Sequence, residues 1–141
     1  MNSRSKRLQP AVDQAHQQTE DALAKLATQQ QQLAKAEHQL GELERYRNEY
    51  AAAGEGGVSV SALLNRQQFV ARIDQAIAQQ SAEVHRQHRR LAQVRDSWQQ
   101  AHARESALGS VVAQHQEHER RAEERREQAE VDERMQQRRS R

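Results

Sequence analysis

Apolar and small residues recur every seven positions over the first third of the chain. From Leu8 to Tyr50 they form two series, offset by four residues, which correspond to the a and d positions of a coiled-coil helix. The repeat stops at Gly54-Glu55-Gly56-Gly57, where the glycines remove helix propensity and permit a turn. The pattern therefore predicts a first helix over residues 8–53, preceded by a basic, flexible segment over residues 1–7.

The seven-residue period resumes after the glycines. Ser59 or Ser61 can cap a second helix, which carries its own a and d series. We predict a Gly/Ser-rich turn over residues 54–60 and a second helix over residues 61–138. Two helices joined by one turn form a hairpin. The predicted fold is therefore all-α, an elongated antiparallel two-helix coiled-coil hairpin.

The facing residues of the two helices can be predicted because an antiparallel pair sets each a position against a d position of its partner. The register that fits best sets Tyr50 against Leu63 and the small Ala36 against the larger Ile77. A pair of facing residues forms one layer of the seam. Three layers of this register pack less well: Leu33 with Gln80, Leu26 with Gln87, and Arg47 with Arg66.

In this register the second helix extends beyond the start of the first. Pairing ends with Leu8 opposite Glu105, so residues 106–141 form a C-terminal single-helix overhang that is unpaired, charged and expected to fray. Oppositely charged side chains three or four positions apart support a solvated single helix. Such pairs are Glu117 with Arg121, Glu123 with Arg126, and Glu130 with Arg134.

The composition argues against a compact enzyme. Only 22 of the 141 residues are Leu, Val, Ile or Phe, below the roughly 20% at which chains usually stop forming a normal core. A net charge of +2 is too small for disorder driven by charge repulsion. The absence of cysteine excludes disulfides and thiolate sites. Without an apolar run of membrane-spanning length, we expect a soluble, unprocessed chain.

Short motifs flank the predicted turn. They are LERYRNEY at residues 43–50, LNRQQFV at residues 64–70 and AIAQQ at residues 76–80, followed by Trp98 and by EQAEVDE at residues 127–133. In residues and in spacing, this set resembles the flagellar type III export protein FliJ family from about Leu8 onward. The chain departs from the family at Ala129-Glu130, where basic residues are usual.

The resemblance implies a non-enzymatic stalk or coupling subunit of the flagellar type III protein export apparatus, similar in form to the coiled-coil stalk of rotary ATP synthases. The implied partners are the hexameric export ATPase ring and the cytoplasmic domain of the membrane export-gate protein, with the ATPase regulator and export chaperones as further partners. The implied location is the cytoplasm, peripheral to the inner membrane at the flagellar base. An injectisome-type secretion stalk and a prefoldin-like chaperone are the alternatives.

Aromatic residues near the turn form the first candidate surface. Tyr46 and Phe69 both occupy g positions, which face each other along one flank of an antiparallel pair. An exposed aromatic stripe is a candidate binding surface, and the resemblance implies the export gate as its partner. The alternative is that both rings fold over the seam between the helices. The predicted gate-binding residues are Gln39, Leu43, Tyr46, Tyr50, Phe69, Ile73, Ala76 and Gln80.

The charged overhang forms the second candidate surface. A helix without a partner in its own chain can insert into a pore or groove, and the resemblance implies the ATPase ring. The alternative is a frayed, solvated tail. The predicted ring-binding residues are Arg120, Arg121, Arg125, Arg126, Gln128, Asp132 and Glu133.

Other chemistry lacks support in the sequence. The histidine pair His115 and His118, with Glu119, needs a further ligand from another element to form a zinc site. The glycine cluster lacks the spacing of a phosphate-binding loop. The pI of about 9.4 suggests nucleic-acid binding as a function. Arginines that are interleaved with glutamates do not form the basic face that such binding needs. We predict no catalytic residue, cofactor, metal or nucleic-acid partner.

Overall fold

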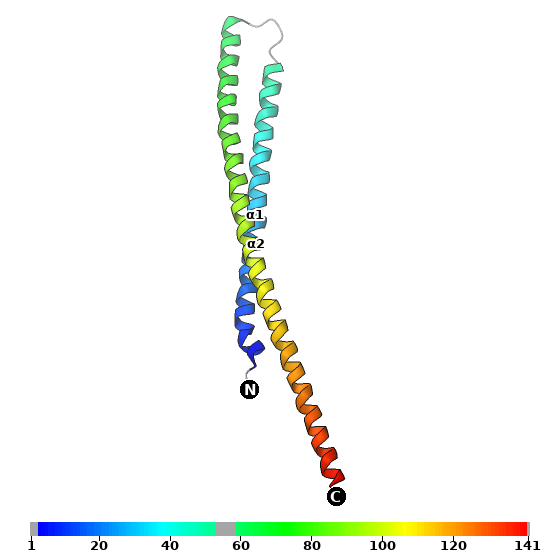
Figure 1. Cartoon of the computed structure of the whole chain (residues 1–141). Helices are drawn as coiled ribbons and strands as arrows, with labels where there is room; N and C mark the ends of the chain where they lie inside the picture. Colours follow the sequence, from blue (N-terminus) through cyan, green and yellow to red (C-terminus); the bar gives the residue numbers. More distant parts are fainter. Residues whose placement is uncertain (1–2, 53–58, 141) are drawn as a thin grey trace. The chain divides into compact units, whose positions relative to one another are not determined.

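The computed structural model describes residues 3–52 and 59–140. It contains helix α1 over Arg4–Ala52 and helix α2 over Val60–Arg139 (Figure 1). The two helices pack antiparallel as a hairpin and α2 is the longer, which confirms the predicted all-α fold. Most of the predicted turn, residues 54–58, lies outside the described residues, as does residue 53 at the predicted end of the first helix.

The helix bounds differ from the predicted ones mainly at the start of α1. This helix begins at Arg4, four residues before the predicted start, so residues 4–7 belong to the helix. Helix α2 extends one residue further at each end than predicted. Ser59 caps it, because its Oγ accepts a hydrogen bond from the backbone N–H of Ala62 at 3.3 Å.

The hairpin divides into two units, each containing part of both helices. The central unit comprises Ala22–Trp98, and the terminal unit comprises Met1–Asp21 with Gln99–Arg141. Each candidate surface lies within one unit: the aromatic residues belong to the central unit and the charged overhang to the terminal unit.

The core of the central unit is a narrow apolar seam. Leu33, Ala36 and Val84 form its buried cluster, against which Leu40 and Leu91 pack. No described side chain is fully buried. The seam buries only part of the apolar residues that the structure describes, since Leu23, Leu64 and Val111 are among those that stay exposed.

The contacts across this seam differ from the predicted pairs. The Gln80 side-chain amide donates to the backbone carbonyl of Ala36 at 3.0 Å. The Gln29 amide donates to the side-chain and backbone oxygens of Gln87, at 2.6 and 3.2 Å. Gln80 and Gln87 therefore hydrogen-bond to α1 residues three positions further along that helix than Leu33 and Leu26, their predicted partners.

Two physical effects explain the difference. Side chains on a helix point toward its N-terminus, and in an antiparallel pair these displacements add. Each α1 residue therefore contacts α2 residues further along the chain than its predicted partner. The observed pairing also joins Gln29 to Gln87, while Leu33 clusters with Val84. Polar groups thus find hydrogen-bond partners instead of facing leucine.

The two arginines of the predicted layer of Arg47 against Arg66 contact other groups instead. Arg47 forms an ion pair with Asp74 of α2, and its Nη2 lies 3.4 Å from Asp74 Oδ2. The Arg66 guanidinium lies 6.0 Å from the centre of the Tyr50 ring. Leu63, the predicted partner of Tyr50, is 46% exposed.

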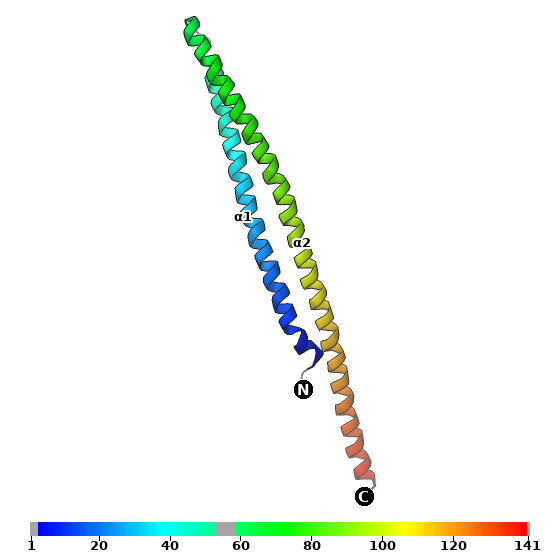
Figure 2. The same ribbon diagram turned by 90° about the vertical axis from the view of Figure 1, so that its left-hand side faces the viewer.

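The start of α1 packs against α2 within the terminal unit (Figure 2). The Ser5 Oγ and backbone N–H both donate to the Glu119 carboxylate, at 2.8 and 3.3 Å. Because α1 has no acidic residue in its first turn, Glu119 supplies from α2 the negative charge that stabilises a helix N-terminus. The hydrogen bond from Ser5 lowers the pKa of Glu119.

Residues 106–141 are therefore only partly unpaired. Val112 is buried, and Glu119 contacts Ser5. The prediction that the whole segment lacks a partner is wrong for its first part, because α1 begins earlier than predicted and its contacts lie further along α2. Residues 123–140 are all exposed. Within the described ranges, neither helix has an apolar stretch long enough to cross a membrane.

Candidate functional site

Three aromatic rings meet in the central unit, and we call them the aromatic cluster: Tyr46, Tyr50 and Phe69. The ring centres of Tyr50 and Phe69 are 4.5 Å apart, and those of Tyr46 and Phe69 are 6.4 Å apart. The two tyrosine rings stack with their centres 6.2 Å apart. These separations fall within the range of favourable ring–ring contacts.

Helix geometry explains how the cluster forms. Tyr46 and Tyr50 are four residues apart on α1 and therefore lie on one face, and Phe69 contacts them from α2. Tyr46 is 51% exposed, whereas Tyr50 and Phe69 are partly buried. Of the two rings predicted at g positions, Tyr46 is therefore half-exposed and Phe69 partly buried.

A shallow groove adjoins Tyr46. It is lined by Gln39, Glu42, Leu43, Tyr46 and Gln80. Four of these residues belong to the predicted gate-binding set, so the structure brings them together. Glu42 was not predicted, although it lies one helical turn before Tyr46, a spacing that could have revealed it.

The other predicted gate-binding residues differ in accessibility. Ile73 is 7% exposed and belongs to the seam. Ala76 is partly buried. The exposed part of the predicted surface therefore centres on Tyr46 and the adjoining groove.

A second hollow adjoins the aromatic cluster, and we call it the arginine pocket. Its volume is about 370 Å³, and it is lined by Tyr50, Ala62, Asn65, Arg66, Gln68, Phe69 and Arg72. The sequence pattern did not indicate this pocket, because the predicted register set Leu63, not Arg66, beside Tyr50.

The charged overhang carries a network of ion pairs within α2. Arg120 pairs with Glu117 at 2.7 Å and also with Glu124, and Arg121 pairs with Glu117 at 3.2 Å. Hydrogen bonds from Arg120 and then Arg121 lower the pKa of Glu117 to about 2. The network confirms the predicted pair of Glu117 with Arg121.

Two further predicted pairs have different outcomes. Arg126 pairs with Glu123 at 2.8 Å, as predicted. Within the described part of α2, Glu130 and Arg134 form no ion pair. The network therefore ends before the last turns of the helix, where exposed Val131 and Met135 add apolar surface.

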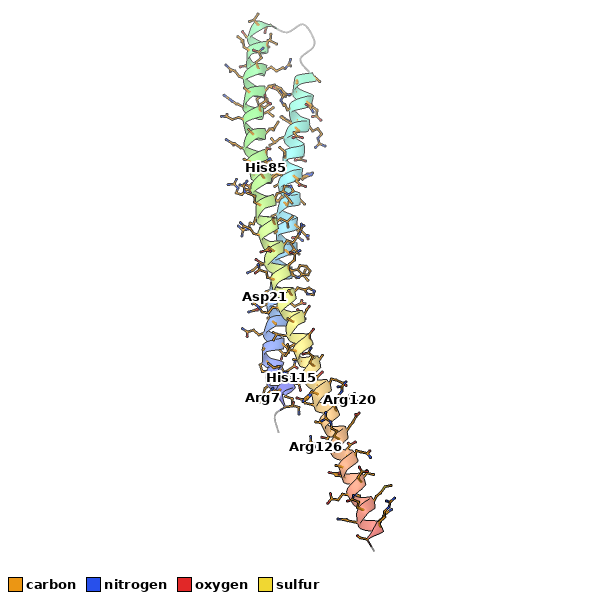
Figure 3. The ribbon with its side chains drawn as sticks, viewed as in Figure 1. Arg7, Asp21, His85, His115, Arg120 and Arg126 are labelled. Carbon is orange, nitrogen blue, oxygen red and sulfur yellow. The ribbon has the colours of Figure 1, made fainter. Side chains whose placement is uncertain are left out.

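The predicted ring-binding residues are all exposed on α2, as Figure 3 shows for Arg120 and Arg126. Gln128 donates to Asp132 at 3.2 Å, one turn along the same helix. Glu119 bonds Ser5 rather than joining the nearby histidines in a metal site. Among the described residues, no group of three histidines or carboxylates has the arrangement of a metal site.

Comparison with known proteins gives a match to a protein family. The sequence model of the FliJ family, described as the flagellar FliJ protein, matches residues 4–141. No curated protein and no solved structure matches the chain. The match covers both helices and both candidate surfaces.

Proposed function

The chain belongs to the FliJ family of flagellar proteins, and on this basis we propose that it couples the hexameric export ATPase to the membrane export gate. Membership implies a component of the flagellar export apparatus, in a family of generally non-enzymatic structural components. The observation that carries the proposal is the family match over residues 4–141. The expected location is the cytoplasmic side of the inner membrane, and the ATPase regulator and export chaperones are further proposed partners.

We propose the aromatic cluster and its adjoining groove as the surface that binds the cytoplasmic domain of the gate protein. Tyr46 offers a half-exposed ring supported from behind by Tyr50 and Phe69. A ring held in place by its neighbours loses little conformational freedom on binding, and aromatic side chains often dominate interface energies. The groove lined by Leu43 and Gln80 can accept side chains of the partner.

A pull-down with the gate cytoplasmic domain tests this surface. Tyr46→Ala and Phe69→Ala should each weaken binding by at least tenfold, the effect typical of a truncated interface anchor. Leu23→Ala is the matched control, because Leu23 is an exposed apolar residue of the same unit and lies outside the proposed surface. Unchanged binding by both aromatic variants, with normal helix content, would refute the gate-binding surface.

The last part of α2 is the proposed contact with the ATPase ring. Its side chains are exposed, and its charges of both signs pair within the helix rather than forming one strongly charged face. Such a surface can contact several ring positions without depending on one specific ion pair. Exposed Val131 and Met135 offer apolar area for the same contact.

Stimulation of the export ATPase tests the ring contact. Full-length chain should raise the rate of ATP hydrolysis, and a chain truncated after Ala122 should not. Truncation at this point keeps the bond between Ser5 and Glu119, so the paired part of the terminal unit retains its contacts. Failure of the full-length chain to change the rate would overturn the proposed coupling role.

Crosslinking provides an independent measurement. A photoreactive residue in place of Arg126 should crosslink to the ring, whereas one in place of exposed His85 in the central unit should not (Figure 3). Equal crosslinking from both positions would indicate non-specific contact.

A further inference from the structure

We propose that the arginine pocket binds a carboxylate of the gate segment that packs on the aromatic cluster. This inference rests on the proposed gate-binding function and specifies the chemistry of the partner. The pocket fits a peptide segment in which an acidic side chain lies next to a large apolar side chain.

Arg66 has positive charge that no group in the described structure neutralises. Its Nη1 is buried without a hydrogen-bond partner among the described residues. The guanidinium lies 6.0 Å from the centre of the Tyr50 ring, which offers a cation–π contact but accepts no strong hydrogen bond. Partial burial of a charged group without a partner is unfavourable, so an incoming carboxylate would relieve it.

Arg47, the other arginine of the predicted layer, provides a comparison because an acidic residue of α2 lies close to it. Arg47 forms an ion pair with Asp74 across the two helices. The hydrogen bond from Arg47 to Asp74 raises the pKa of Arg47. Within the described part of the chain no carboxylate pairs with Arg66 as Asp74 does with Arg47, which leaves Arg66 available to an acidic group of a partner.

The lining of the pocket favours an anion over a neutral group. Arg72 adds a second positive charge, and Asn65 and Gln68 add amide donors. No acidic residue lines the pocket in the described structure, whereas Glu42 lines the neighbouring groove. A guanidinium can bind a carboxylate through two parallel hydrogen bonds, which gives geometric as well as electrostatic selectivity.

The position of the pocket explains why the acid should belong to the same partner segment. Tyr50 and Phe69 are members of the aromatic cluster and also line the pocket. An apolar side chain on the exposed cluster and a carboxylate in the pocket would therefore be close neighbours on the partner. The volume of about 370 Å³ suits one or two side chains rather than a folded element.

Binding of the gate cytoplasmic domain to charge variants tests the pocket. Arg66→Gln should raise the dissociation constant roughly tenfold, as expected for the loss of one charge-assisted hydrogen-bonded pair. Arg66→Lys keeps the charge but not the paired hydrogen bonds, so its affinity should fall between those of Arg66→Gln and the unchanged chain. Replacing the acidic residues of the gate's binding segment by amides should make Arg66→Gln nearly neutral.

Arg86→Gln is the matched control, because it removes the same charge from an exposed α2 site of the same unit. Its affinity should stay within about twofold, since removal of a distant exposed charge changes binding weakly. Equal weakening by Arg66→Gln and Arg86→Gln would overturn the pocket, because it would indicate general charge attraction.

The outcomes separate this inference from the proposed function. If Tyr46→Ala weakens gate binding and Arg66→Gln does not, the carboxylate site is refuted and the gate-binding surface stands. If the unchanged chain does not bind the gate domain, both are refuted.

Discussion

The hydrogen-bonded pair of Gln29 and Gln87 offers a direct test of how the helices are held in register. Gln29 is 3% exposed and donates to two oxygens of Gln87. Substitution of Gln29 by Leu removes both hydrogen bonds, each with a net value of about 0.5–1.5 kcal/mol, and leaves polar atoms of Gln87 without their donor. Added apolar contact from Leu offsets part of the loss. We expect the free energy of unfolding to fall by about 1–2 kcal/mol.

Urea unfolding followed by circular dichroism at the helix band measures this change. Gln30→Leu is the matched control, because Gln30 is the exposed neighbour of Gln29. Its effect should stay within about 0.5 kcal/mol, as is usual for surface substitutions. A normal dependence of the unfolding free energy on urea would show that both variants unfold cooperatively.

A double-mutant cycle gives the decisive comparison. Replacing both partners of a buried hydrogen bond by apolar residues is often nearly neutral. Gln29→Leu with Gln87→Leu should therefore be more stable than the sum of the single effects predicts, by about 1 kcal/mol. Additive effects would refute the pairing, because they are expected if Gln87 faces Leu26 and never meets Gln29.

Further predictions concern the core of the central unit and the contacts between α1 and α2 in the terminal unit. Leu33→Ala removes buried apolar volume and should lower the free energy of unfolding by about 2–4 kcal/mol in the same urea assay. The 2.7 Å hydrogen bond to Glu105 raises the pKa of His16, with Glu20 and Asp13 adding to the effect. Since the folded-state pKa lies above the unfolded value near 6.5, the stabilisation is complete below that pH and is lost as the pH rises through the raised value. The melting temperature should therefore fall more between pH 6 and pH 8 in the unchanged chain than in His16→Gln. Glu119→Gln should speed amide hydrogen exchange in the first turn of α1 and leave exchange at Leu33 unchanged.

The heptad pattern predicted part of the seam. Leu33 and Ala36, which the predicted register sets in the seam, are buried, whereas Leu63, the predicted partner of Tyr50, is 46% exposed. The seven-residue period of apolar residues identifies the face of a helix that packs against its partner, because this period depends only on local helix geometry. The fold class followed from that pattern and from one cluster of glycines.

The pattern could not predict which residues meet across the seam. Neighbouring registers bury nearly the same residues, so the choice depends on small differences between layers. Those differences come from polar groups, such as the amides of Gln29 and Gln87, and from the direction in which side chains leave the helix. The capping of α1 by Glu119 was hidden for a similar reason, since the two residues that bond are far apart in sequence.

The pairing of Gln29 with Gln87 also bears on the arginine pocket. Both features belong to the central unit, and one register governs both. A shift of α2 by half a heptad would remove Gln87 from Gln29 and would also remove Arg66 from Tyr50.

In the double leucine variant the polar constraint on the register is gone, although the apolar seam is larger. A buried polar residue often selects one register at some loss of stability. If the glutamine pair does so here, the double variant should fold stably but bind the gate domain more weakly. Unchanged gate affinity would show instead that the aromatic cluster and the remaining seam hold the register without the glutamines.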